Sequence, residues 1–257
     1  MGLGLCLRNY GVYMEHLNFL KKVHDNLLDY APKLIVSDEN LCQMFLRALH
    51  SSLIELSGCL ILLLDNEGKT GVPSIARTFL ETYVEFYNLH KDGRYFYNME
   101  ANYLEESKRI RDEILGKKNY LQYIDDDRIT KEQSERDAES MELKELNDNG
   151  FKKLSVLERF QRAEMEDVYR SYYAILCSYD HPSLHALISR HVKIESANGD
   201  IETFLYADKP IETYLSEIQM VTKGLINSAI DIHTLLNSEA LPEVKILQKS
   251  FDEYFAT

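Results

Sequence analysis

Apolar residues spaced three and four apart recur along most of this chain, and few residues interrupt the pattern. Such spacing places apolar side chains on one face of an α-helix. The 257 residues include only 5 prolines and 11 glycines, which suits long helices joined by short loops. Because 45% of the residues are hydrophobic and 28% are charged, we predict an all-α, multi-helix bundle rather than a disordered chain.

The helix boundaries follow from the signals that begin and end helices. Helices are expected at about 10–30, 37–64, 73–92, 155–180, 210–237 and 242–257. A capping box formed by Ser155 and Glu158 marks the beginning of the fourth, which is predicted to break near Ala163. A chain of this length fits one hydrophobic core, so residues 1–257 are predicted to form a single helical domain.

The segment at about 94–150 is strongly charged. We predict that it forms a protruding helical segment, broken at Asp125–Asp127 and resumed by a capping box of Thr130 and Gln133. Its charge runs are most simply the solvated surface of helices.

One stretch departs from helical spacing. Apolar and polar residues alternate in His191–Glu195 and again in Ile201–Tyr206, and Asn198–Gly199 between them favours a tight turn. A small β-hairpin near residues 192–206 is therefore expected as the only sheet. Because an isolated hairpin is marginally stable in water, this one must pack on the bundle or pair with another chain.

The net charge of −13 opposes long-range attraction to phosphate backbones. Nucleic-acid binding would need a local basic patch, for which the nearest candidates are Arg170, Arg190, His191 and Lys193. The apolar run Leu56–Leu64 is shorter than the roughly 20 residues of a membrane helix, so no membrane contact is expected. The segment Met1–Leu7 lacks the features of a secretory signal, so we expect a cytoplasmic protein.

No cofactor and no metal are expected. The cysteines are far apart, without metal-like or redox-like spacing: Cys6, Cys42, Cys59 and Cys177. Gly68–Thr70 matches the end of a phosphate-binding loop, but Leu63 stands where that motif needs a glycine. Pro182 breaks the single-helix geometry that His181 and His185 would need to hold zinc.

The helix at 73–92 is apolar around most of its circumference but carries one narrow polar stripe: Ser74, Arg77, Glu81, Glu85 and Asn88. Arg77 and Glu81 lie one turn apart and can pair. The stripe is either the solvent face of an amphipathic helix or the lining of an internal cleft. In a cleft, Arg77 and Glu81 would need partners for their charges.

A second polar face is predicted on the helix before Pro182. Its members recur at three- and four-residue spacing: Ser171, Ala174, Ser178 and His181. Small residues allow close helix approach, and the hydroxyls and imidazole offer hydrogen bonds. Because a residue before proline avoids the α region, His181 should end the helix, where the helix dipole favours a protonated imidazole. We predict that Arg77, Glu81 and His181 lie within hydrogen-bonding or one-water distance.

Two segments resemble a known family. Ser74–Glu81 forms an R-x3-E helix, and Tyr169–Ser183 contains a Y…S…H-P-S pattern. Together they resemble a bacterial all-helical family known as domain of unknown function five-six-seven-seven, over roughly Leu41–Leu205. The resemblance implies an all-helical fold without an established activity. It singles out as candidate site residues, catalytic or structural, Arg77, Glu81, Ser178 and His181.

Such proteins are also loosely similar to helical nucleases of toxin and phage-defence systems. The nuclease signature is an arginine followed by four to six residues and a histidine. Here Arg47 and His50 are too close, and Arg170 and His181 are too far apart. The resemblance therefore gives only weak support to ribonuclease chemistry.

Competing functions follow from these features. The favoured one is a helical binding or interaction protein built around the Arg/Glu/Ser/His cluster, in bacterial stress or phage defence. The alternative is a metal-independent ribonuclease-like defence effector, in which His181 transfers protons and Arg77 stabilises negative charge on phosphorus. A metal hydrolase that uses His181 and His185 is the least favoured. The ligand, the partner and the assembly, including a homo-oligomer, stay open.

Overall fold

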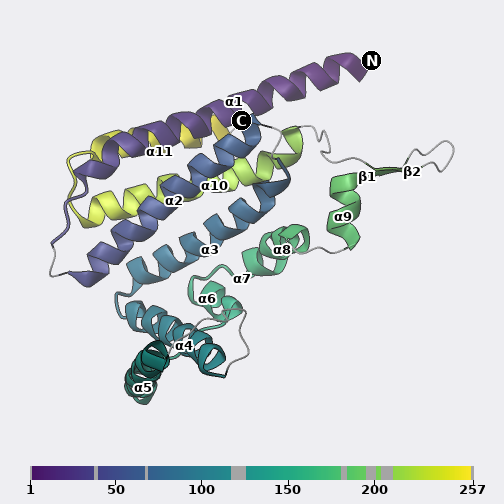
Figure 1. Ribbon diagram of the computed structural model, residues 1–257. Helices are drawn as coiled ribbons and strands as arrows, with labels where there is room; N and C mark the ends of the chain where they lie inside the picture. The colour runs from purple at the N-terminus through teal and green to yellow at the C-terminus, as the bar shows by residue number, and fades with distance from the viewer. Residues whose placement is uncertain are drawn as a thin grey trace.

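The computed structural model describes residues 2–37, 40–66, 69–116, 126–180, 184–194, 201–203 and 211–255. Long helices that contact one another build the body of the molecule (Figure 1). They are α1 (Gly2–Tyr30), α2 (Leu41–Asp65), α3 (Val72–Lys91), α10 (Leu215–Leu235) and α11 (Leu241–Phe255). The all-α bundle predicted from the apolar spacing is confirmed.

Helix α2 is the most apolar of these elements. By length and composition alone it could cross a membrane, but here it packs against α1, α3 and α10. The Asn40 side chain begins the helix by accepting a hydrogen bond from the backbone N–H of Gln43, at 3.0 Å. The helix expected at about 37–64 was predicted to begin earlier, at Ser37. The error arises because serine and asparagine both cap helices, and the sequence of the first turn of α2 does not distinguish between the two positions.

Helix α10 lies in the core and contacts α1, α2, α3 and α11. Along the side that meets these helices its residues are at most 1% exposed: Ile218, Val221, Leu225, Ala229 and Ile232. Gly224 allows α10 to approach α3 closely, since a Cβ at this position would lie 2.7 Å from the Phe79 ring. The glycine thus sets the separation of the two helices that flank the site described below.

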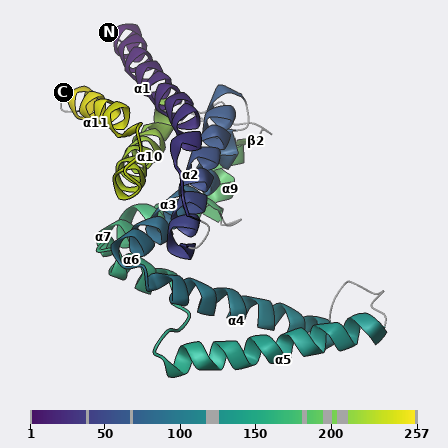
Figure 2. The same cartoon turned by 90° about the vertical axis from the view of Figure 1, so that its left-hand side faces the viewer.

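Helices α4 (Tyr95–Leu115) and α5 (Asp126–Asp148) pack side by side and extend together away from the bundle (Figure 2). Arg111 joins them by ion pairs with Glu132, Glu135 and Glu139. The predicted capping box at Thr130 and Gln133 is wrong, because α5 already begins at Asp126 and both residues lie inside it.

After this hairpin the chain returns through short helices. These are α6 (Val156–Arg162), α7 (Glu166–Val168), the π-helix η3 (Tyr169–Tyr173), α8 (Ala174–Asp180) and α9 (Leu184–His191). The Ser155–Glu158 capping box is confirmed: the Glu158 N–H donates to Ser155 Oγ at 3.2 Å, and the Ser155 N–H donates to Glu158 Oε2 at 2.8 Å. The predicted break is also confirmed, because Ala163 ends α6 and Glu164 follows with φ of 59°.

Strands β1 (Val192–Ile194) and β2 (Ile201–Thr203) form a short antiparallel ladder, with Val192 opposite Thr203. Residues 195–200 and 204–206 lie outside the described residues. The predicted hairpin over 192–206 and its turn at Asn198–Gly199 therefore stay a prediction beyond these three-residue strands.

Two histidines are buried between α2 and α10. His50 is 1% exposed, and its Nδ1 lies 3.0 Å from Ser228 Oγ. The ring of His233 is also buried, with its centroid 6.4 Å from that of His50. Burial, with a smaller contribution from His233, lowers the pKa of His50 from 6.5 to about 3. As the pH falls below 6.5, the imidazole of His50 becomes protonated in the unfolded chain but stays neutral in the folded protein. The free energy of unfolding therefore decreases.

We therefore expect the melting temperature to fall between about pH 7.5 and about pH 5, and the His50→Asn variant to show a smaller fall. Asparagine retains a polar group near Ser228 but cannot become protonated. The variant measured at the higher pH controls for any loss of packing. Equal falls for wild type and variant would contradict this role of His50.

Candidate functional site

The polar stripe on α3 is covered at its centre by the π-helix η3. Arg77 Nε donates to Glu81 Oε1 at 2.9 Å, which confirms the predicted pairing, and Tyr173 OH donates to the same oxygen at 2.7 Å. The guanidinium of Arg77 also lies 5.5 Å from the Tyr173 ring centroid. Burial opposes its charge, but the bonds to Tyr173 and Glu81 outweigh this effect and raise the pKa of Arg77. The pair is thus part of a helix contact.

One turn further along α3, Glu85 joins two other segments. Its carboxylate accepts from Tyr95 OH at 2.7 Å and from Arg159 at 2.6 Å, while Asn88 donates to the Arg159 carbonyl at 2.9 Å. Tyr95 belongs to α4 and Arg159 to α6. Together with Tyr173 from η3, they attach three segments to the polar stripe of α3. The side chains of Arg77 and Glu81 are 24% and 30% exposed, so this part of the stripe is largely covered.

The π-helix gives two neighbouring tyrosines separate roles. A π-turn is wider than an α-turn and shifts the register of side chains, and such turns often occur at functional sites. Tyr173 contacts Glu81 on α3, whereas Tyr172 lines a cavity beside α10. The two faces of the η3–α8 segment therefore serve different neighbours.

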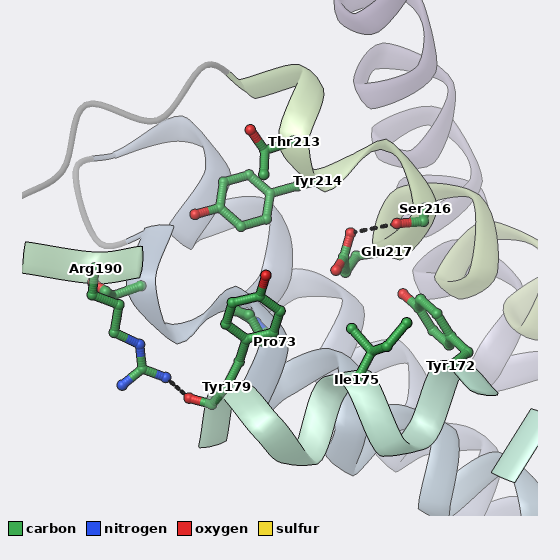
Figure 3. Close-up of a pocket in the computed structure, with 10 residues that line it drawn as sticks. Pro73, Tyr172, Ile175, Tyr179, Arg190, Thr213, Tyr214, Ser216 and Glu217 are labelled. Atoms are coloured by element: carbon green, nitrogen blue, oxygen red, sulfur yellow. Dashed lines mark hydrogen bonds between the residues drawn. The ribbon is translucent and has the colours of Figure 1, made fainter. Parts of the chain in front are cut away.

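That cavity lies between η3–α8 and the beginning of α10, with a volume of about 200 Å³. Tyr172, Ile175 and Tyr179 recur at three- and four-residue spacing and form one wall (Figure 3). The opposite wall comes from η4 (Ile211–Tyr214) and α10, which contribute Tyr214 and Glu217. The cavity thus combines phenol rings, apolar surface and one carboxyl group.

Glu217 is the unusual member of this lining. It is only 8% exposed, and Ser216 Oγ donates to its Oε2 at 3.0 Å. Burial raises the pKa of its carboxyl, against the opposing effect of the hydrogen bonds that it accepts. Within the described residues no basic side chain forms an ion pair with Glu217. Glu217 lies in the first turn of α10, where the helix dipole favours a negative charge.

The sequence-predicted site residues are only partly assembled. Arg77 and Glu81 pair, while Ser178 Oγ donates to the Ile175 carbonyl of its own helix at 2.7 Å. His181 lies outside the described residues, so its predicted approach to Arg77 and Glu81 stays a prediction. The side chain of His185 is likewise outside them.

The predicted small-residue face toward α3 needs a correction. Ser171 and Ala174 are exposed, and the buried residues of this segment are Tyr173 and Leu176. The helix contacts α3 through a neighbouring face, from which Tyr173 donates to Glu81.

The site predicted from the sequence lacks Tyr173, Arg159 and Glu217. Tyr173 and Arg159 bind glutamates that are 92 and 74 residues away in the sequence, so no local pattern indicates these contacts. Glu217 could have been found from the sequence, because it shares a helical face with Val221 and Gly224, where an acidic residue is unexpected.

The sequence profile of a family of unknown function, DUF5677, matches residues 43–200, more than half of the chain. This stretch contains the polar stripe and the tyrosine wall of the cavity, whereas Glu217 lies beyond it. Comparison with curated proteins and with solved structures gave no match.

The contact between η3 and α3 can be tested by Tyr173→Phe. Removing the hydroxyl leaves Glu81 with one donor fewer, and we expect a loss of roughly 1–2 kcal/mol in the free energy of unfolding, measured by urea denaturation. Tyr103→Phe, at an exposed position on α4, is the matched control and should change little. Equal effects of the two changes would show that the Glu81 bond does not stabilise the fold.

Proposed function

The chain belongs to the DUF5677 family, and we propose that it is a helical binding protein whose cavity beside α10 holds a small molecule with a protonated amine. One observation carries the proposal: a nearly buried carboxyl, Glu217, lines a cavity without a basic side chain paired to it among the described residues. The polar stripe on α3 supports the cavity wall rather than the chemistry of the ligand.

An amine fits this lining for electrostatic reasons. Burying an ionised carboxylate is costly unless a positive charge and hydrogen-bond donors accompany it. A protonated amine supplies both to Glu217 and can also donate to the Ser216 hydroxyl. The faces of tyrosine rings attract cations, and Tyr172 and Tyr214 stand on either side of Glu217 (Figure 3). Ile175 offers apolar contact for the body of the ligand.

The contacts of Arg77 favour this function over ribonuclease chemistry. Its guanidinium already serves Glu81 and Tyr173, so stabilising a phosphorus-centred transition state would require breaking these bonds. Of the candidate basic patch, Arg170 pairs with Glu166 at 2.5 Å, and Arg190 donates to the Tyr179 carbonyl. The charge of Arg170 is therefore balanced by an internal carboxylate, and Arg190 lines the cavity described above.

Phenethylamine is a suitable probe, because it joins a protonated amine to an aromatic ring. We expect it to bind the wild type in calorimetry and to raise the melting temperature. Ile175→Trp should block the cavity and abolish both effects while leaving the protein folded, since Ile175 is 53% exposed. Ile246→Trp, at an exposed position on α11, should bind normally. The proposal fails if the wild type does not bind, or if both variants bind as the wild type does.

Glu217→Gln tests the carboxyl itself through pH. Because burial raises the pKa of Glu217 above 4.5, folding favours its protonated form, and the ionised form costs stability as the pH rises through the raised pKa. The groups that face it are Ser216, Tyr172 and Tyr214, of which the phenols stay neutral in this range.

We therefore expect Glu217→Gln to melt at a higher temperature than wild type near neutral pH, with no difference below about pH 4.5. In the same samples, binding of phenethylamine should be lost at every pH. A variant that binds the amine as tightly as the wild type would remove Glu217 from the site, whatever its effect on melting.

A further inference from the structure

A positive side chain stands at the other end of the same cavity. Arg190 comes from α9 and lines the cavity together with Tyr179 and Tyr214. Figure 3 shows Arg190 on one side of the cavity and Glu217 toward the other, with the rings of Tyr179 and Tyr214 between them. The charge of Arg190 also acts on Tyr214 and opposes the rise in the pKa of that phenol. The cavity is therefore electrically asymmetric along its length.

Arg190 retains binding capacity. A guanidinium has five N–H donors, and Arg190 uses one nitrogen for the carbonyl oxygen of Tyr179. That bond fixes the side chain at the rim without neutralising it, since a carbonyl carries no net charge. An arginine held in this way is prepared for a carboxylate or a phosphate, which its planar fork binds well.

We infer that the ligand carries two opposite charges, an amine held at Glu217 and an anionic group held at Arg190, joined by an apolar or aromatic spacer. This inference rests on the proposed function and adds the second charge and the spacing. Repulsion between Arg190 and the amine fixes the orientation of the ligand. An α-amino acid is a poor match, because its amine and carboxylate are attached to the same carbon atom, whereas Glu217 and Arg190 lie apart across the cavity.

A matched set of probes separates the two charges. Phenethylamine carries only the amine, 4-ethylbenzoate carries only the carboxylate, and 4-(2-aminoethyl)benzoate carries both at opposite ends of one ring. Tyramine O-phosphate replaces the carboxylate by phosphate. Affinities are measured by calorimetry on the wild type, Arg190→Gln, Arg190→Lys and Glu217→Gln, with melting temperatures recorded to show that each variant is folded.

We expect the doubly charged probes to bind the wild type about threefold to fivefold more tightly than phenethylamine does, which is the gain of a partly exposed ion pair. Arg190→Gln should remove this gain, so that the doubly charged probes bind the variant no more tightly than phenethylamine does, whereas Arg190→Lys should retain part of it. Glu217→Gln should weaken every probe that has an amine. The better of the carboxylate and the phosphate identifies the anion.

The outcomes distinguish the two proposals. If phenethylamine binds as tightly as the doubly charged probes, or if Arg190→Gln leaves their advantage unchanged, the inference about the second charge is wrong while the amine site stands. If none of the amine probes binds the wild type, the proposed function itself is wrong, and this inference fails with it.

Discussion

The arrangement of this protein depends on the burial of α3 among its neighbours. Its apolar side chains leave only one polar stripe, and α2 and α10 cover much of the rest. Any segment that packs on the stripe must therefore bring polar partners, and the chain supplies Tyr95 from α4, Arg159 from α6 and Tyr173 from η3. Unpaired burial of Glu81 and Glu85 would be costly, so these bonds specify where the returning segments can dock.

The hydrogen bond between Tyr173 and Glu81 also helps to form the cavity. Once the Tyr173–Glu81 bond fixes η3 on α3, the π-turn directs Tyr172 to the opposite side, toward α10. Gly224 keeps α10 close to α3, and the first turn of α10 then places Glu217 in front of that tyrosine wall. A stabilising network and a binding cavity thus share one short segment. On the proposed function, polar residues in α3 would therefore influence ligand binding without touching the ligand.

The sequence predicts the elements of this fold better than their contacts. Helical spacing identifies α2, α3 and α10, and the Ser155–Glu158 capping box locates α6, because these signals depend only on neighbours within a turn or two. The pairing of Arg77 with Glu81 is local in the same sense. Tyr173 could not be placed, since its partner Glu81 is 92 residues away in the sequence and local spacing does not indicate which face of the segment meets α3. The capping box predicted at Thr130 and Gln133 was wrong for another reason. The residue types that form such a box also occur inside a charged helix.

Glu217 shows which features of a binding cavity a local sequence pattern can indicate and which depend on the fold. An acidic residue on an apolar helix face signals that a partner is required, and α10 displays that signal in the sequence. The identity of the partner depends on residues from α8 and α9, which reach the cavity only through the fold. Tyrosine rings around the carboxyl favour a cation, and Arg190 at the far end favours an anion. The chemistry proposed for the ligand therefore rests on the order of charges along the cavity, which no single helix encodes.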